Sequence, residues 1–279
     1  MHLKQLINNL VVSSLMAFTG GLFFSAGVFA QTLVLVPGYQ SDGGIWRKTG
    51  FVNALLSAGW QDAGHVMADP YGVRMLVEQK KSERRFFTVN LPAEAPLIVQ
   101  ANILSAQLNA IRNRFQDEPL LLAGHSVGGV VARLAMVREP ALKLDALITF
   151  AAPHLGTGMA EAGLGISQSP IGWVAPLLGA STINRSRELY ADLMRERPGS
   201  LLFWLNRQPH PESKYYSVVR SQHGGFSNWR DQVVDPFSQD MNNVVALRGK
   251  SLFIASPLKH GLHPADGVLL ADLLKQCCK

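Results

Sequence analysis

Short, continuously apolar runs alternate along this chain with stretches in which apolar residues recur at helical spacing. Continuously apolar runs are typical of strands buried on both faces, as in a parallel sheet that is covered by helices. We therefore expect an α/β fold with an open, mostly parallel sheet flanked by helices. The expected strands cover residues 32–36, 85–89, 120–123, 147–150, 215–219 and 252–255, and the expected helices include 98–115, 127–137 and 266–274.

The first thirty residues have the pattern of a secretory signal peptide. An apolar stretch over residues 10–29 follows a short start with one lysine, and Val28 and Ala30 stand where a signal peptidase accepts small residues. Cleavage after Ala30 would leave one domain, residues 31–279, in a secreted or periplasmic protein. An uncleaved anchor is the alternative, because the stretch is close to the about 20 residues that span a bilayer.

Composition and charge exclude several other classes of protein. Apolar residues make up 47% of the chain and charged residues only 16%, which excludes an intrinsically disordered protein. The two cysteines, Cys277 and Cys278, are adjacent and build no disulfide framework. The net charge is +6, but the basic residues are scattered, so we expect no nucleic-acid partner. A basic surface is compatible with contact to an anionic lipid or membrane surface.

The pattern that indicates chemistry is Gly124-His125-Ser126-Val127-Gly128, a G-x-S-x-G sequence. It stands between an expected strand and an expected helix, so Ser126 would occupy a tight turn that lifts its hydroxyl above the end of the sheet. The two glycines would let the strand and the helix approach each other closely. Ser126 is therefore the candidate nucleophile of an acyl-transfer reaction.

A serine nucleophile needs a base and an orienting carboxylate, which in this fold follow in the order serine, acid, histidine. His260 follows the last expected strand and is the favoured base, with His263 as the alternative. The acid is expected in the loop after the fifth strand, where Asp231 is favoured over Asp235 and Asp240. The two aspartates that are not the acid are expected to cap helices or to be solvated.

Acyl transfer also needs two backbone N–H groups that bind the oxyanion. One is expected from Val127, the residue after the nucleophile, where the positive end of the helix adds to the effect. The other is expected from Tyr39, in the glycine-rich loop after the first strand. The side chain of Tyr39 is expected to be incidental.

Several segments resemble the α/β-hydrolase superfamily, and within it the secreted bacterial lipases and esterases. They are residues 33–39 with Trp46, 123–129, 151–157, 231–234 with 238–239, and His260 with Asp266. The resemblance implies a Ser126, Asp231 and His260 triad, an oxyanion hole at Tyr39 and Val127, and a sheet that lacks the first two strands of larger members.

Two features depart from the usual pattern of these lipases. The chain has Pro37-Gly38 where the family usually has His-Gly, and a longer glycine-rich stretch, residues 223–229, precedes the expected acid. Some lipases bind a structural Ca²⁺ near the acidic loop; no residue pattern here requires one, and the reaction needs no cofactor.

The segment between the fourth and fifth strands, residues 157–213, is longer than a crossover requires. Its apolar part, residues 171–179, favours a helical cap or lid that lines an acyl pocket over the serine. We therefore expect a secreted hydrolase of carboxylic esters with a hydrophobic ester as substrate. A thioesterase, a phospholipase, a polyester hydrolase and a non-catalytic binding protein on the same fold remain open.

Overall fold

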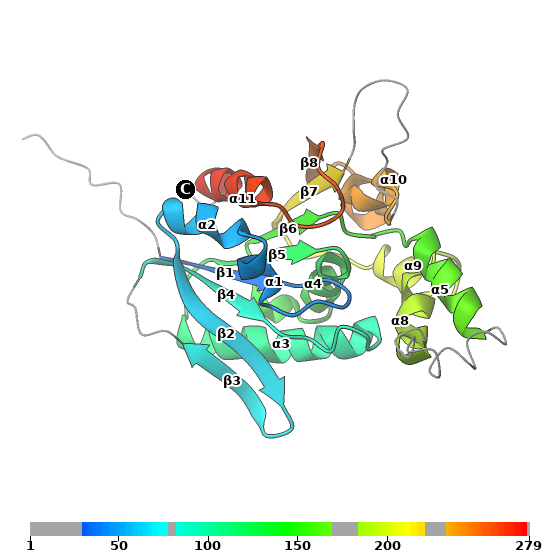
Figure 1. Ribbon diagram of the computed structural model, residues 1–279, viewed down its shortest axis with the longest axis horizontal. Coiled ribbons are helices and arrows are strands. Elements are labelled where there is room, and N and C mark those ends of the chain that lie inside the picture. Colours follow the sequence, from blue (N-terminus) through cyan, green and yellow to red (C-terminus); the bar gives the residue numbers. More distant parts are fainter. Residues whose placement is uncertain (1–29, 78–81, 169–183, 221–232, 278–279) are drawn as a thin grey trace, which may run out of the picture.

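The computed structural model describes residues 30–77, 82–168, 184–220 and 233–277 (Figure 1). Its centre is an eight-stranded sheet with the strand order β3-β2-β4-β1-β5-β6-β7-β8. Every neighbouring pair is parallel except β2 and β3, which are antiparallel. The strands are β1 Gln31–Val36, β2 Gln61–Asp69, β3 Gly72–Val77, β4 Arg84–Val89, β5 Leu120–His125, β6 Ala146–Phe150, β7 Lys214–Arg220 and β8 Ser251–Ser256.

Helices cover both faces of the sheet, because its central strands, such as β1, have apolar side chains on both faces. The side chains of β1 are buried without exception, and successive residues point to opposite faces. Val34 and Val36 pack into the core under α3 and α4, whereas Leu33 and Leu35 pack into the core under α2 and α11. Figure 1 shows α2 and α11 above the sheet and α3 below it. These helices are α2 Phe51–Ser57, α3 Leu97–Arg114, α4 Val127–Arg138 and α11 Pro264–Cys277, and the short α1 Ile45–Lys48 precedes α2.

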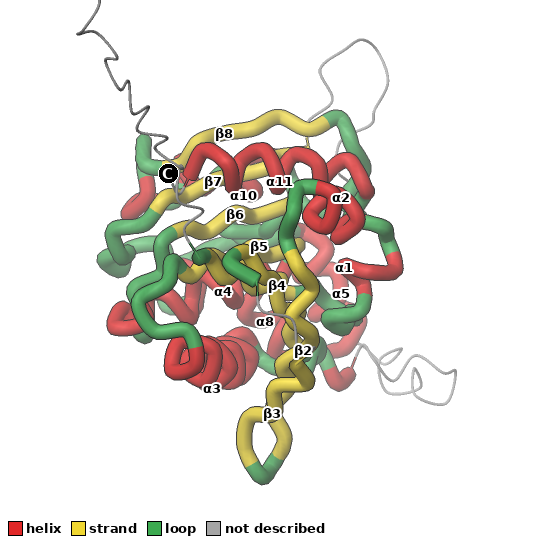
Figure 2. The backbone as a smooth tube through the Cα atoms, turned by 90° about the vertical axis from the view of Figure 1, so that its left-hand side faces the viewer, coloured by secondary structure: helices red, strands yellow, loops and turns green. Residues whose placement is uncertain are grey.

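The hairpin of β2 and β3 is a feature that the sequence analysis missed. It joins the sheet beyond β4 and projects from the body of the molecule (Figure 2). Residues in β3 alternate between exposed and half-buried, so this strand has none of the continuous apolar pattern used to find the others. The sheet therefore carries two extra strands at the edge where the resemblance implied that strands are missing.

The insertion between β6 and β7 is helical in its described part. It contains α5 Gly158–Gln168, α8 Arg187–Leu193 and α9 Leu201–Leu205, which gather on the right of Figure 1. The expected apolar stretch 171–179 lies outside the described residues. Arg185 forms an ion pair of 2.6 Å with Glu94, and the Asp192 carboxylate accepts a 2.8 Å hydrogen bond from the N–H of Leu97 at the start of α3. These contacts place the insertion beside the carboxyl end of β4.

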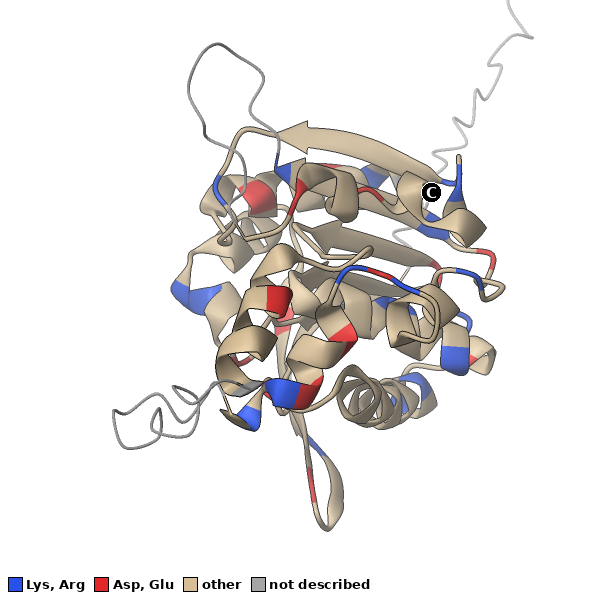
Figure 3. Cartoon of the chain, turned by 90° about the vertical axis from the view of Figure 1, so that its right-hand side faces the viewer, with Lys and Arg blue, Asp and Glu red and all other residues tan. Residues whose placement is uncertain are grey.

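The surface on this side carries both signs of charge. Figure 3, which views the molecule from the side of the insertion, shows Lys and Arg interspersed with Asp and Glu. Among the helices of the described ranges, none is long and apolar enough to cross a membrane.

Candidate active site

Ser126 lies on the tight turn between β5 and α4 with backbone angles φ 50° and ψ −127°. A positive φ is unfavourable for a residue with a side chain, and such strain is typical of a nucleophile held above a sheet. The N–H of Ser126 donates a 2.8 Å hydrogen bond to the carbonyl of Phe150 at the end of β6, which ties the turn to the sheet. The Ser126 Oγ lies 3.0 Å from Nε2 of His260.

Close backbone packing brings the loop after β1 against this turn. A Cβ atom at Gly128 would lie 2.3 Å from the carbonyl oxygen of Pro37 and 2.6 Å from that of Val36. A Cβ at Gly38 would lie 3.1 Å from the Cβ of Ser126. Glycine at these two positions is therefore what allows the β1 loop to reach Ser126.

The two expected oxyanion donors adjoin these close-packed residues. Val127 is the first residue of α4, where the N–H has no partner inside the helix. Tyr39 follows Gly38 in the β1 loop. Within the part of the chain that the structure describes, neither N–H donates a hydrogen bond to another protein group.

The base candidate His260 lies in the loop between β8 and α11. His125, the residue before the nucleophile, donates from Nε2 to the backbone carbonyl of His260 at 2.9 Å. Burial, together with the nearby His260 and Arg220, lowers the pKa of His125 to about 4. His125 is therefore neutral at pH 7, and its single N–H joins the Ser126 turn to the loop that carries His260.

His263, the alternative base, has a different environment. Its backbone N–H donates to the Asp266 carboxylate at 2.9 Å, and its ring Nε2 is buried without a hydrogen-bond partner among the described residues. The contact with Ser126 Oγ is made by His260. The geometry thus favours His260 over His263.

The expected acid, Asp231, lies outside the described residues. Its two rivals have defined structural contacts. Asp235 caps α10 Pro236–Gln239 by accepting a 2.8 Å hydrogen bond from the N–H of Phe237, and Asp240 accepts one of 2.9 Å from the N–H of Asn242. Both carboxylates are used as caps, the role that was expected for the aspartates that are not the acid.

The side chain of Tyr39, which we expected to be incidental, ties the β1 loop to the insertion. Its hydroxyl forms hydrogen bonds of 2.9 Å with Ser186 Oγ and 2.7 Å with the Tyr190 hydroxyl of α8. These partners are about 150 positions further along the chain. No feature of the sequence points to such a contact.

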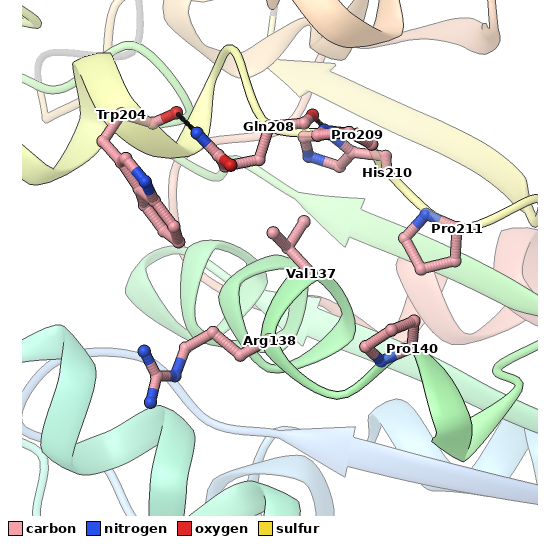
Figure 4. A pocket seen from close by; sticks show the side chains of 8 residues that line it. All are labelled: Val137, Arg138, Pro140, Trp204, Gln208, Pro209, His210 and Pro211. Carbon is pink, nitrogen blue, oxygen red and sulfur yellow. Dashed lines mark hydrogen bonds between the residues drawn. The ribbon is translucent and has the colours of Figure 1, made fainter.

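Two depressions lie near α4 and the β1 loop. One of about 580 Å³ is lined by Gln40 and residues 92–95, at the carboxyl ends of β1 and β4. The other, of about 560 Å³, lies at the far end of α4 (Figure 4), roughly 18 Å from Ser126 at 1.5 Å per helical residue. Its lining residues are Val137, Arg138, Pro140, Trp204 and 208–211. Among the described residues, no group of His, Cys, Asp and Glu could hold a metal ion.

The strand order, the tight turn after β5 and the histidine after β8 are those of an α/β-hydrolase fold. Residues 32–164 match the family model described as a PGAP1-like alpha/beta domain. No curated protein matches the sequence.

Solved structures with the same fold are similar to this chain at low sequence identity. The propeptide form of Bacillus licheniformis lipase BlEst2 is 14% identical with a TM-score of 0.59, over 89% of this chain and 50% of that one. The chain thus spans half the length of that lipase form. The product of Listeria innocua gene lin2722 is 12% identical (TM-score 0.56, 89% and 94% covered), and the metagenomic carboxyl esterase MGS0156 is 14% identical (TM-score 0.52, 88% and 74% covered). The expected fold is confirmed.

Proposed function

We propose that this protein is a serine hydrolase that cleaves carboxylic esters through an acyl-enzyme. The observation that carries the proposal is the 3.0 Å contact between Ser126 Oγ and His260 Nε2, on a turn with a positive φ at the serine. A hydroxyl at this distance from an imidazole can transfer its proton as it attacks a carbonyl carbon. The similarity to a lipase and a carboxyl esterase supports the same chemistry.

In the first half of the reaction, Nε2 of His260 accepts the hydroxyl proton while Ser126 Oγ forms a bond to the ester carbonyl carbon. The N–H groups of Tyr39 and Val127 donate to the resulting oxyanion. The C–O bond of the ester then breaks, and the leaving alcohol takes the proton from His260.

In the second half, water attacks the acyl-enzyme. His260 accepts a proton from the water and returns it to Ser126 as the carboxylic acid leaves. Asp231 is the proposed acid that orients the imidazole and stabilises its charged form. The reaction consumes one water and needs no cofactor.

The proposed substrate is a hydrophobic acyl ester, delivered at a lipid or membrane surface. Exposed apolar side chains on the insertion support this, since Met159 and Ile166 of α5 are 56% and 42% exposed. In this proposal the insertion, residues 157–213, is the cap of the acyl pocket. The protein acts outside the cytoplasm after removal of residues 1–30 as a signal peptide.

The test is hydrolysis of nitrophenyl esters with short to long acyl chains by the wild type and by Ser126→Ala. We expect activity in the wild type and a loss of at least about 10⁴-fold in the variant, because the other groups cannot replace the nucleophile. A fluorophosphonate should label the wild type and not the variant. An optimum at long chains would define a lipase, and an optimum at short chains an esterase.

A matched pair of histidine variants tests the base. His260→Ala should lose activity, and His263→Ala should keep it, since His260 Nε2 lies 3.0 Å from Ser126 Oγ whereas the backbone N–H of His263 donates to Asp266. The reverse result would move the base to His263. A wild type that is inert on every ester and unreactive with the fluorophosphonate would refute the proposal of a serine hydrolase and favour a binding protein. Turnover of thioesters, phospholipids or polyesters in place of simple esters would change the proposed substrate class.

A further inference from the structure

A buried ion pair lies where the loop that carries His260 leaves the sheet. Arg220 is the last residue of β7, and Asp266 lies in the first turn of α11. Both side chains are 1% exposed. The guanidinium donates to both carboxylate oxygens, from Nη1 at 2.7 Å and from Nη2 at 2.8 Å, which is the bidentate geometry that fixes relative orientation most firmly.

The same two side chains contact the loop that carries His260, residues 257–263, at its beginning, middle and end. We call this segment between β8 and α11 the base loop. Arg220 Nη1 donates to Ser256 Oγ at 2.7 Å, at the end of β8, and Nη2 donates to the carbonyl of Gly261 at 3.2 Å, next to His260. The Asp266 carboxylate accepts from the N–H of His263 at 2.9 Å. The loop from β8 to α11 is therefore wrapped around one ion pair.

The main chain of Arg220 has a second connection. Its N–H donates to Oε1 of the buried Gln239 at 2.8 Å, and Nε2 of Gln239 donates to the carbonyl of Val234 at 2.8 Å. Arg220 and Val234 stand on either side of the segment 221–232, which contains Asp231. One residue thus joins the base loop to both ends of the segment in which the acid is expected.

Stability alone does not explain such a pair. Removing an arginine and an aspartate from water costs several kcal/mol each, and apolar residues of similar volume in the same places are often neutral or stabilising. What apolar residues lack is the directed set of hydrogen bonds to Ser256, Gly261 and His263. The ion pair therefore fixes the conformation of the loop, and with it the position of His260.

We propose that Arg220, through its ion pair with Asp266, is a positioning residue that sets His260 at hydrogen-bond distance from Ser126. The inference rests on the proposed function. It gives Arg220 no contact with substrate. Its effect is on how well the imidazole is aligned for proton transfer, where a displacement of about 1 Å costs on the order of 100-fold in rate.

The test compares two variants with a matched control in the full chain. Arg220→Met/Asp266→Leu removes both charges together and leaves no unpaired one, and Arg220→Lys keeps the charge but not the fork of donors. The control, Arg85→Met/Glu118→Leu, removes a largely buried ion pair from the amino ends of the strands, away from the site. Active sites are counted by fluorophosphonate titration, so that kcat refers to folded enzyme.

We expect kcat on a nitrophenyl ester to fall about 100-fold in the double variant and about tenfold in Arg220→Lys, with KM within twofold of the wild type. The control pair should keep kcat within threefold even where its melting temperature falls. If the double variant does not fold, Arg220→Lys decides the question.

Wild-type kcat in Arg220→Lys or in a folded double variant would overturn the positioning role, and so would an equal loss in the control pair. These results differ from failure of the proposed function, in which the wild type itself hydrolyses no ester.

Discussion

A methyl group at position 128 is expected to disable the proposed oxyanion hole while leaving Ser126 and His260, the proposed nucleophile and base, in place. In Gly128→Ala the new Cβ would lie 2.3 Å from the carbonyl oxygen of Pro37, whereas ordinary contacts begin at 3.4 Å. Both neighbouring atoms, this oxygen and that of Val36, belong to the backbone and cannot rotate away. The β1 loop would have to move by about 1 Å, and Tyr39 with it.

The magnitude follows from that displacement. Overpacking of this kind costs about 1–3 kcal/mol of stability. An oxyanion donor displaced by about 1 Å costs on the order of 100-fold in rate, which is about 2.7 kcal/mol of transition-state stabilisation. Because the oxyanion exists only after attack, kcat and kcat/KM should fall together while KM changes little.

The assay is steady-state ester hydrolysis together with urea unfolding of the wild type, Gly128→Ala and a control. Gly165→Ala in α5 is the control, because its Cβ meets nothing within 4 Å and should raise helix stability by up to about 1 kcal/mol without a loss of rate. A Gly128→Ala variant that keeps kcat within threefold and its unfolding free energy within about 0.5 kcal/mol of the wild type would contradict the expected displacement of the β1 loop.

Two further predictions concern the acid and the pH dependence of folding. Asp231→Asn should lower kcat by about 10⁴-fold, whereas Asp235→Asn should keep it within threefold, since asparagine also caps a helix; the opposite pattern in the same ester assay would place the acid at 235. Burial lowers the pKa values of His125 and His210 to about 4, so the unfolded chain binds protons below about pH 6.5 that the folded chain does not bind until about pH 4. The free energy of unfolding should therefore fall as the pH decreases from 6.5 to 4, by about 1 kcal/mol per pH unit for each histidine. In urea titrations at several pH values, His210→Gln should reduce this fall. An unchanged pH dependence in that variant would contradict the lowered pKa of His210.

The parts of the fold that the sequence predicts are those with a continuous apolar pattern. The strands expected from residues 32–36 and 120–123 are found, with ends that differ by at most two residues, because a strand buried on both faces has to be apolar at every position. The β2–β3 hairpin was missed because its residues are half exposed and need not be apolar. In β3 exposed and half-buried residues alternate, and this strand can be assigned only once its pairing with β2 is known.

The contacts that organise the site depend on pairs that are distant in the sequence. The G-x-S-x-G pattern predicts Ser126 as the nucleophile because the turn and its glycines are local. The chain order predicts His260 as the base because each loop follows a strand. The partner of Arg220 is 46 residues away, and that of the Tyr39 hydroxyl is about 150 away. In the sequence alone, Arg220 and Tyr39 cannot be distinguished from ordinary solvated or packed residues, because their partners are brought close only by the fold.

His125 is excluded as the base by the expected chain order, but it has a structural role beside the loop that carries His260. Its place before Ser126 makes it unsuitable as the base in the expected chain order, and the 3.0 Å contact with the serine hydroxyl is made by His260. The same place puts its ring beside the base loop, where burial keeps it neutral and its N–H binds the carbonyl of His260. In the proposed reaction a positively charged side chain there would repel the imidazolium of His260, and an apolar side chain would lack the hydrogen bond to the His260 carbonyl. A neutral histidine meets both conditions, so His125, beside the proposed nucleophile, helps to hold the loop of the proposed base.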